Sequence, residues 1–386
     1  MNKIYLDNSA TTKICKEALD KYIEVSSEHF GNPSSLHALG FDAEKVIEAA
    51  RDEIRTSLGA RGASVIFTAS GSEANNLAII GRAYAKERFA RGKIITTEGE
   101  HASVDEPLSS LIKDGFRIAK IPTHGGRLDL DALERELTPD TVLVTMMMVN
   151  NETGALYDIA AAARLTKSLA KNALVHVDAT QSYMKIPFTK ASLGADMITL
   201  SSHKIEGPKG VGALLVDASV IKSGGLRALI LGGGQEQGLR SGTENVPAIA
   251  AFAEAVRVGR AHLTERHLAL KSLREYLLTK LSGIGEISVT LPENSSPSIV
   301  NITLPNIKSE TMLHHLSSFG IFVSSGSACS SNSKHTSSAL VAYGRSPEEA
   351  DCSIRISLSH RNTREELDAF SEALSSGLSR LSRIRR

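Results

Sequence analysis

From about residue 60 to residue 250, short apolar runs alternate with stretches of helical periodicity. Runs rich in Val, Ile and Leu are typical of parallel strands buried on both faces, and the helical stretches between them serve as crossover connections. The predicted strands are Ser64–Thr68, Lys93–Thr97, Arg117–Ile121, Thr141–Met147, Leu174–Asp178, Met197–Leu200 and Gly212–Val216, and the predicted helices include Glu73–Ala90 and Ile159–Ala170. The pattern predicts an α/β fold with a mainly parallel central sheet.

After about residue 250 the pattern changes. A long charged helical stretch, Val246–Leu281, is followed by a strand at Ser298–Thr303, a helix near Glu310–Phe319 and a final helix from Arg364. Because 386 residues are many for one hydrophobic core, we expect two domains. We assign residues 14–258 to a large domain, residues 259–386 to a smaller α+β domain, and residues 1–13 to a segment that packs with the small domain.

Charge and hydropathy exclude several classes of protein. The chain has 44 basic and 43 acidic residues, so no global field attracts nucleic acid or an anionic membrane. The four arginines between residues 380 and 386 are interpreted as a solvated helix end rather than a partner-docking patch. No apolar run is long enough to span a membrane, and the amino terminus lacks the apolar stretch of a signal peptide. We therefore expect a cytoplasmic protein that binds neither nucleic acid nor membranes.

The three cysteines, Cys15, Cys329 and Cys352, are too few and too scattered for a disulfide framework or a zinc site. In a reducing compartment each is a free thiol. The pair His314-His315 has no cysteine or acid at metal-ligand spacing and is interpreted as the polar side of a helix. We expect no metal site.

The stretch from Val65 to Glu73 predicts a strand that runs into a turn of small residues. Ser70 and Glu73 have the spacing of a capping box before an amphipathic helix. The amides of Gly71 and Ser72, at the positive end of that helix, would suit a phosphate group. An ordinary capped helix is the alternative interpretation.

Two further strands end in residues that suit a cofactor. Asp178 stands at the carboxyl end of a probable buried strand, where open α/β sheets bind ligands, and it could pair with a pyridine ring nitrogen or simply cap the next turn. Gln181 follows three residues later. Lys204 comes after the next strand and the polar turn of residues 201–203, a context that favours a Schiff-base lysine over a solvated one. Together these features suggest that Lys204 is a Schiff-base lysine at the sheet edge that Asp178 also reaches.

Three other residues are candidates for chemistry. His101 follows the strand that ends at Thr97, so it reaches the same sheet edge and could act as a general base. Cys329 lies in the serine-rich segment Ser324–Lys334, which we predict to be a mobile loop; its surroundings favour a nucleophile over a chance surface thiol. Arg355 interrupts an apolar strand pattern, which suits capture of a carboxylate, with a buried ion pair as the alternative.

Five further segments extend these motifs: Leu6–Thr12, Gly31–Ser35, Val149–Gly154, Arg240–Asn245 and Gly326–Cys329. With these motifs in this order, the chain resembles the cysteine desulfurases of the class V aminotransferase group. The resemblance is to the branch that serves iron–sulfur cluster assembly and nitrogenase maturation. The resemblance spans nearly the whole chain and rests on the full set, since each segment alone is weak. It implies the fold type I architecture of pyridoxal-phosphate enzymes.

Carried over residue by residue, the resemblance implies a complete cofactor site. Lys204 would bind pyridoxal phosphate covalently, His101 would stack on its ring and move protons, Asp178 would pair with the ring nitrogen and Gln181 with the phenolic oxygen. The residues that would hold the phosphate are Gly71, Ser72, Ser201 and His203, with Thr243 from a second subunit.

The resemblance also implies substrate and partners. Asn151, which also borders the cofactor, and Arg355 would grip the carboxylate of free L-cysteine. Cys329 would take the substrate sulfur as a persulfide, leaving L-alanine, and pass it to an acceptor such as an iron–sulfur scaffold protein. A homodimer follows from the role of Thr243. The competing hypotheses are a selenocysteine lyase, another class V aminotransferase-like enzyme, or a non-catalytic sulfur-relay or scaffold protein.

The chain departs from the usual family pattern in several places. Gln237 stands where the family commonly has arginine, and Glu206 where an aromatic residue is frequent. The phosphate turn reads Ser-Gly-Ser-Glu where Gly-Ala-Thr-Glu or Gly-Gly-Thr-Glu is common. Cys352 is not expected from the family, and it is either a packing residue or a second thiol near the substrate.

Overall fold

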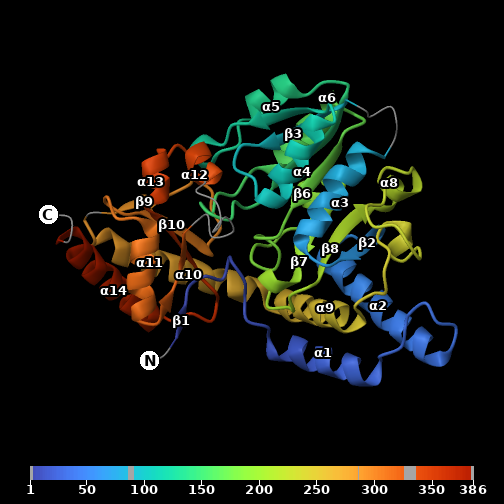
Figure 1. Cartoon of the computed structure of the whole chain (residues 1–386), viewed down its shortest axis with the longest axis horizontal. Helices are drawn as coiled ribbons and strands as arrows, with labels where there is room; N and C mark the ends of the chain where they lie inside the picture. The colour runs from blue at the N-terminus through green and yellow to red at the C-terminus, as the bar shows by residue number, and fades with distance from the viewer. Residues whose placement is uncertain (1–2, 86–90, 286, 326–335, 384–386) are drawn as a thin grey trace.

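The structure is a computed structural model, and it describes residues 3–85, 91–285, 287–325 and 336–383. A central sheet occupies one end of the molecule, and a smaller sheet lies at the other end together with both chain termini (Figure 1). Among the described residues, no helix is long and apolar enough to cross a membrane.

The central sheet has the strand order β2-β8-β7-β6-β5-β3-β4. All of its strands are parallel except β8, which runs antiparallel to β2 and β7. The strands are β2 (Ala63–Thr68), β3 (Lys93–Thr97), β4 (Arg117–Ile121), β5 (Thr141–Met147), β6 (Leu174–Asp178), β7 (Met197–Ser201) and β8 (Gly212–Asp217). The predicted α/β fold with a mainly parallel sheet is confirmed. Strand β8 reverses because the short connection 202–211 cannot make the crossover that parallel pairing requires.

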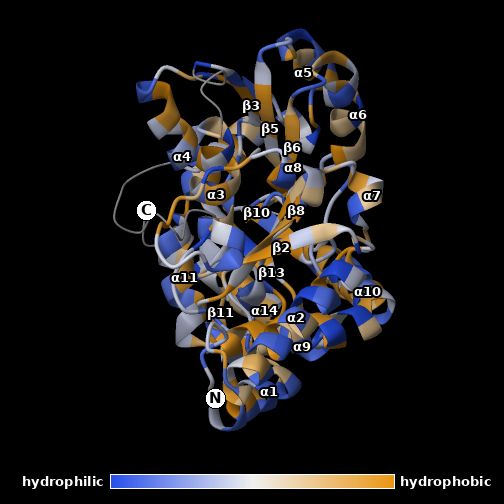
Figure 2. Cartoon of the chain, turned by 90° about the vertical axis from the view of Figure 1, so that its right-hand side faces the viewer, coloured by the Kyte–Doolittle hydropathy of each residue, from blue (hydrophilic) through white to orange (hydrophobic). Residues whose placement is uncertain are grey.

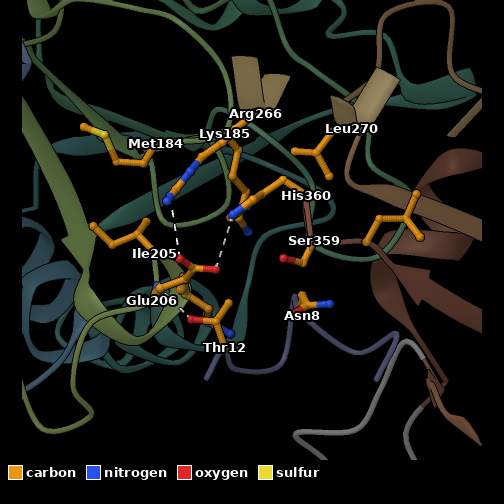
Figure 3. Close-up of a pocket in the computed structure, with 12 residues that line it drawn as sticks. Asn8, Thr12, Met184, Lys185, Ile205, Glu206, Arg266, Leu270, Ser359 and His360 are labelled. Atoms are coloured by element: carbon orange, nitrogen blue, oxygen red, sulfur yellow. Dashed lines mark hydrogen bonds and ion pairs between the residues drawn. The ribbon is translucent and has the colours of Figure 1, made fainter. Parts of the chain in front are cut away.

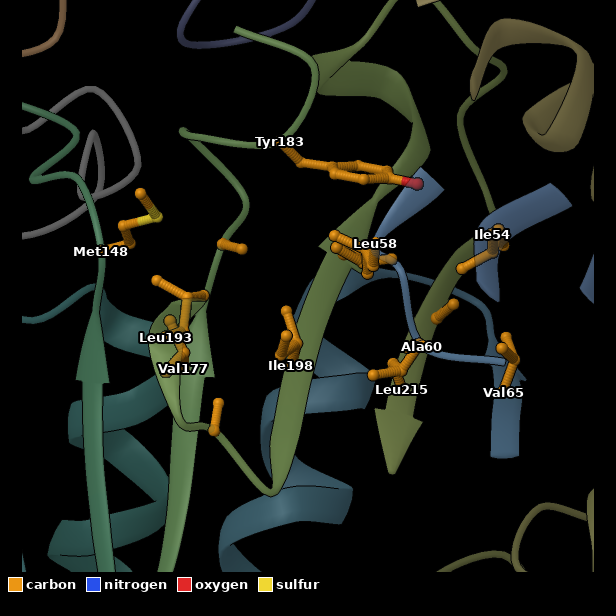
Figure 4. Close-up of a cluster of buried hydrophobic side chains, with 14 of the residues drawn as sticks. Ile54, Leu58, Ala60, Val65, Met148, Val177, Tyr183, Leu193, Ile198 and Leu215 are labelled. Atoms are coloured by element: carbon orange, nitrogen blue, oxygen red, sulfur yellow. The ribbon is translucent and has the colours of Figure 1, made fainter. Parts of the chain in front are cut away.

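Successive residues of the strands face opposite sides of the sheet and join different hydrophobic cores. Leu214 belongs to one core together with α3 (Gly71–Ala83) and α4 (Ala102–Lys113). Leu215, drawn in Figure 4, belongs to the core on the other face together with α2 (Ala38–Ser57), α6 (Ile159–Leu169) and α9 (Val246–Ala261). The strands are accordingly hydrophobic along most of their length (Figure 2). The helices of this region are α1 (Lys16–Glu28), α2 (Ala38–Ser57), α3 (Gly71–Ala83), α4 (Ala102–Lys113), α5 (Leu130–Glu136), α6 (Ile159–Leu169), α7 (Lys190–Leu193), α8 (Ala218–Lys222) and α9 (Val246–Ala261).

The smaller sheet is antiparallel, in the order β12-β13-β10-β9, and has its own hydrophobic core. Strand β1 (Ile4–Tyr5) pairs in parallel with β11 (Ile321–Phe322), and the neighbouring Leu6 is buried in that second core. The remaining elements are α10 (Leu263–Ser282), β9 (Ser288–Thr290), β10 (Ile299–Thr303), α11 (Ser309–Ser318), β12 (Ser324–Ser325), α12 (Ser338–Tyr343), α13 (Pro347–Asp351), β13 (Ser353–Ser357) and α14 (Arg364–Arg383).

The structure corrects three sequence predictions. The helical stretch 246–281 is two helices that meet at His262, because α9 packs in the large core and α10 in the small one. Helix α3 ends at Ala83, where Tyr84 caps it and packs edge-on against Phe116, while residues 86–90 lie outside the described part. Ser324 and Ser325 are a short strand rather than loop, because β13 offers them an unpaired edge.

Candidate active site

Four parallel strands bring their carboxyl ends to one edge of the central sheet. Met147 at the end of β5 lies beside Asp178 at the end of β6, and Asp178 lies beside Thr199 of β7. Ser201 ends β7, and Thr97 ends β3 shortly before His101. The turns that follow these strands therefore share one edge, where ligands of open α/β sheets bind.

Lys204 ends the 3-10 turn η3 (Ser202–Lys204), which follows β7 directly. Its Nζ donates hydrogen bonds to the main-chain carbonyls of Ser9 (2.5 Å) and Ala10 (2.8 Å). The Nε2 of Gln181 donates to the same Ser9 carbonyl at 3.0 Å. The amino-terminal segment thus joins two predicted site residues that lie on different strand ends.

A chain of hydrogen bonds connects Asp178 with His101. Asn75 of α3 donates from Nδ2 to the Oδ2 of Asp178 and to the Oγ of Ser103, both at 2.8 Å. The Ser103 hydroxyl lies 2.8 Å from the Nδ1 of His101, and the Ser103 amide donates to that nitrogen at 3.1 Å. Since Nδ1 accepts from this amide, the proton of the neutral imidazole sits on Nε2. Asn75 and Ser103 were not predicted, although a polar residue on the buried face of a helix is a usable signal.

The predicted phosphate turn is tightly packed. Ser70 caps α3 by accepting from the Glu73 amide at 3.1 Å, but the Glu73 carboxylate bonds the Ala69 amide, so the predicted capping box is only half formed. A Cβ on Gly71 would lie 3.1 Å from the Cβ of Ser201. Gly71 and Ser201 are buried together, while Ser72 is exposed at the helix start.

His203 lies next to Lys204 and contacts the amino-terminal segment. Its Nδ1 is 3.2 Å from the Oγ1 of Thr11. Burial, reinforced by the charges of Lys204 and nearby lysines, lowers the pKa of His203 to about 4, so this ring is neutral at physiological pH.

Arg355 of β13 is buried and occupies a position between the two sheets. Its Nη2 donates to the Oδ1 of Asp7 at 2.9 Å, and its Nη1 to the carbonyl of Asn151 at 3.0 Å. Arg355 therefore forms a buried ion pair, which was the alternative interpretation of this residue from the sequence. Burial raises the pKa of Asp7, and the charges of Arg355 and Lys204 partly offset this effect.

Two predicted residues stand apart from this cluster. Thr243 is exposed, on the segment that Arg240 ties to α3 through a 2.9 Å ion pair with Glu73. Cys329 lies outside the described residues, as does most of the segment in which we predicted a mobile loop.

Sequence reasoning missed Lys185, which lies in the turn after β6 and is buried. Its Nζ donates to the Oε1 of Gln181 at 3.0 Å. Burial, together with the charges of Lys204 and Arg355, lowers the pKa of Lys185 to about 7. The i, i+4 spacing from Gln181 was the only available signal.

Lys185 and Glu206 line one pocket (Figure 3), and Lys204 also belongs to its lining. Glu206 is buried and accepts a 3.0 Å hydrogen bond from the Nη2 of Arg361, whose Nε lies 3.0 Å from the other carboxylate oxygen, and Arg266 lies 3.6 Å away. Two arginines thus surround the carboxylate at the position where the family often has an aromatic residue.

Comparison with known proteins agrees with these features. The model of the "Aminotransferase class-V" family matches residues 4–370. "Cysteine desulfurase IscS 1" of Archaeoglobus fulgidus is 38% identical over 380 residues, which cover 98% of this chain and 97% of the relative.

Solved structures are similar as well. A "NifS-like protein" superposes with a TM-score of 0.90 at 36% identity, covering 98% of this chain and 100% of that one. A structure described as "SspA in complex with cysteine" has a TM-score of 0.80 at 31% identity, covering 94% of this chain and 100% of that one. The chain therefore belongs to the class V aminotransferase family, and within it to the cysteine desulfurases, as its sequence motifs predict.

Proposed function

We propose that this protein is a pyridoxal-phosphate-dependent cysteine desulfurase that converts free L-cysteine to L-alanine and transfers the sulfur to Cys329. One observation carries the proposal: Lys204, Gln181, Asp178 and His101 lie at one sheet edge. One set of hydrogen bonds joins Lys204 and Gln181, and a separate set joins Asp178 and His101. The similarity of the whole chain to cysteine desulfurases supports the same reaction.

The residues at this edge fit pyridoxal phosphate. At the start of α3, a Cβ on Gly71 would press against Ser201, so a glycine there keeps room beside the helix terminus, and the hydroxyl of Ser202 in the turn after β7 is buried with no hydrogen-bond partner among the described residues. Asp178 is a buried carboxylate, which suits a protonated ring nitrogen. When bound, the cofactor supplies an electron sink that weakens the bonds at the Cα of an attached amino acid.

The side chains of the protein would bind, orient and exchange protons. Lys204 would hold the cofactor, and Gly71, Ser72, Ser201, His203 and the Thr243 of a second subunit would surround the phosphate. His101 would exchange a proton through Nε2, because Ser103 occupies Nδ1.

Arg355 is suited to bind the substrate carboxylate beside Asn151. Its guanidinium has five N–H donors, of which Asp7 and Asn151 take one each. The Nε of Arg355 is buried and has no hydrogen-bond partner among the described residues. A carboxylate that reaches this nitrogen would gain a charge-assisted hydrogen bond.

Cys329 would act as the sulfur acceptor. Its thiolate attacks the substrate sulfur, an S–S bond forms, and the carbon–sulfur bond breaks with its electron pair left on carbon. That carbon takes up a proton and becomes the methyl group of alanine. The sum, Cys329 thiol plus L-cysteine to persulfide plus L-alanine, needs no external oxidant.

We further propose a cytoplasmic homodimer that passes sulfur to an acceptor such as an iron–sulfur scaffold. A reducing compartment suits a reactive thiol. Large apolar side chains are exposed along α1, the start of α2 and the segment before Thr243; Leu36 is 91% and Leu231 is 80% exposed. Exposed apolar clusters of this kind favour association.

The test is an assay of alanine and sulfide after incubation with pyridoxal phosphate, L-cysteine and a reductant. Wild type should make both products, Lys204→Ala neither, and Cys329→Ala should keep the visible cofactor band but lose sulfide. Cys352→Ala is the matched control. A protein that binds no pyridoxal phosphate, a Cys329→Ala variant with normal sulfide production, or turnover of L-selenocysteine alone would contradict the proposal.

A further inference from the structure

Lys185 is a buried cation for which the proposed reaction gives no role. It lies in the turn after β6, and no carboxylate forms an ion pair with it in the part of the chain that the structure describes. Lysine is seldom buried without such a partner, because removing an ammonium group from water is costly. Its Nζ donates a hydrogen bond to the Oε1 of Gln181 at 3.0 Å.

This contact determines how the Gln181 amide is oriented. A lysine ammonium only donates hydrogen bonds, so the atom that faces Nζ must be the amide oxygen. The NH2 group of Gln181 then points the other way and donates one proton to the Ser9 carbonyl at 3.0 Å. Lys204 donates to the same carbonyl at 2.5 Å. Because Gln181 shares this acceptor with Lys204, the Ser9 carbonyl orients the amide less strongly than an unshared acceptor would. Without Lys185, only the Ser9 carbonyl would distinguish the two nearly isosteric amide orientations, so the energy difference between them would be smaller.

We propose that Lys185 is a positioning residue, which keeps the N–H groups of Gln181 directed toward the cofactor side of Lys204. The inference rests on the proposed function, in which Gln181 donates to the phenolic oxygen of pyridoxal phosphate. One N–H is used by Ser9, and the second remains for that oxygen.

The experiment measures the pH midpoint of the visible absorbance of the cofactor-loaded enzyme, a readout independent of turnover. Lys185→Met, which has similar length but no donor, should raise the midpoint by about 0.5 to 1 pH unit, because the phenolic oxygen loses a donor and accepts more strongly from the protonated lysine nitrogen. Gln181→Met should shift it in the same direction. Lys185→Arg retains a donor and should return the midpoint toward wild type.

The decisive comparison is the double variant Lys185→Met, Gln181→Met. If Lys185 acts through Gln181, the double variant should have the midpoint of Gln181→Met alone, whereas additive shifts or an unshifted Lys185→Met would overturn the inference. Lys209→Met is the control. Lys209 is exposed, its charge acts on His203, and it makes no recorded contact with Gln181, so its removal should leave the midpoint unchanged.

If Lys185→Met does not fold, Lys185→Gln replaces it. This variant retains a donor, so its pH midpoint must lie between those of wild type and Gln181→Met.

Failure of the inference can be distinguished from failure of the proposed function. A wild-type protein with no visible band would refute the proposed function itself, whereas a normal band with unchanged midpoints would refute only the role of Lys185.

Discussion

Arg51→Met should strongly destabilise the large region of the protein. Arg51 of α2 forms a bidentate ion pair with Glu236 of the 3-10 turn η4 (Glu236–Gly238), at 2.8 and 2.9 Å. The side chains are only 8% and 2% exposed. Arg51 also donates to the carbonyl of Val65 in β2 and packs on the ring of Phe67 at 5.0 Å. Methionine keeps an unbranched apolar side chain but removes every one of these donors.

The magnitude follows from what remains buried. Without Arg51, the Glu236 carboxylate retains the Phe67 amide at 2.8 Å as its hydrogen-bond donor. Breaking a buried ion pair in this way costs about 3 to 5 kcal/mol. With ~2.1 cal/mol/K per residue, a chain of this length has an unfolding entropy of roughly 0.8 kcal/mol/K. Dividing the lost stability by this entropy gives a fall in Tm of about 4 to 6 °C.

Scanning calorimetry of the protein and three variants provides the measurement. Arg55 lies one turn further along α2, and Arg55→Met removes a pair with the exposed Asp52 and a hydrogen bond to the Ala63 carbonyl, so it should lower Tm by at most about 2 °C. The double variant Arg51→Met, Glu236→Leu should recover at least half of the loss, because neither charge is then left unpaired. An Arg51→Met variant as stable as Arg55→Met, or a double variant less stable than Arg51→Met, would refute the reasoning.

Three further predictions concern the cofactor cradle, a buried histidine and the proposed dimer. Gly71→Ala should weaken pyridoxal phosphate binding about tenfold or more in an absorbance titration, because the new Cβ would lie 3.1 Å from Ser201; Gly62→Ala, with open space around it, is the control. Burial lowers the pKa of His176 from 6.5 to about 4, so the unfolded chain takes up a proton that the folded one does not, and stability falls as the pH drops through this interval. His176→Gln should therefore lose less Tm between pH 6.5 and pH 4 than wild type, and an equal loss in both would count against this explanation. Leu231→Asp should halve the mass seen in gel filtration, and a monomeric wild type would contradict the dimer.

The ends of the strands explain why much of the candidate site could be predicted. Buried parallel strands leave a clear apolar pattern, and all parallel strands of a sheet expose their carboxyl ends at one edge. Asp178 and Lys204 follow directly after such runs, so their positions in the sequence are enough to predict that they share this edge. The same reasoning locates His101 after β3.

The connecting residues could not be predicted in this way. Asn75 connects Asp178 with His101, and it lies 103 residues before Asp178 in the chain. Nothing in its local sequence indicates which carboxylate it contacts. The shared acceptor of Lys204 and Gln181 is a main-chain carbonyl of Ser9, and a main-chain group leaves no mark on a sequence. Lys185 looks like any other lysine until its burial is known.

By itself, the sequence determined the strand-and-helix order, the sheet edge at which the chemistry gathers, and the family. These properties follow from local periodicity and from residue types that few other sites require. Only the tertiary structure decided that Arg355 pairs with Asp7 across 348 residues, that Ser324 and Ser325 join a sheet edge, and that Lys185 holds Gln181. The physical reason is that hydrogen bonds and ion pairs between distant segments depend on how the two cores pack together, and packing brings together residues that no local pattern connects.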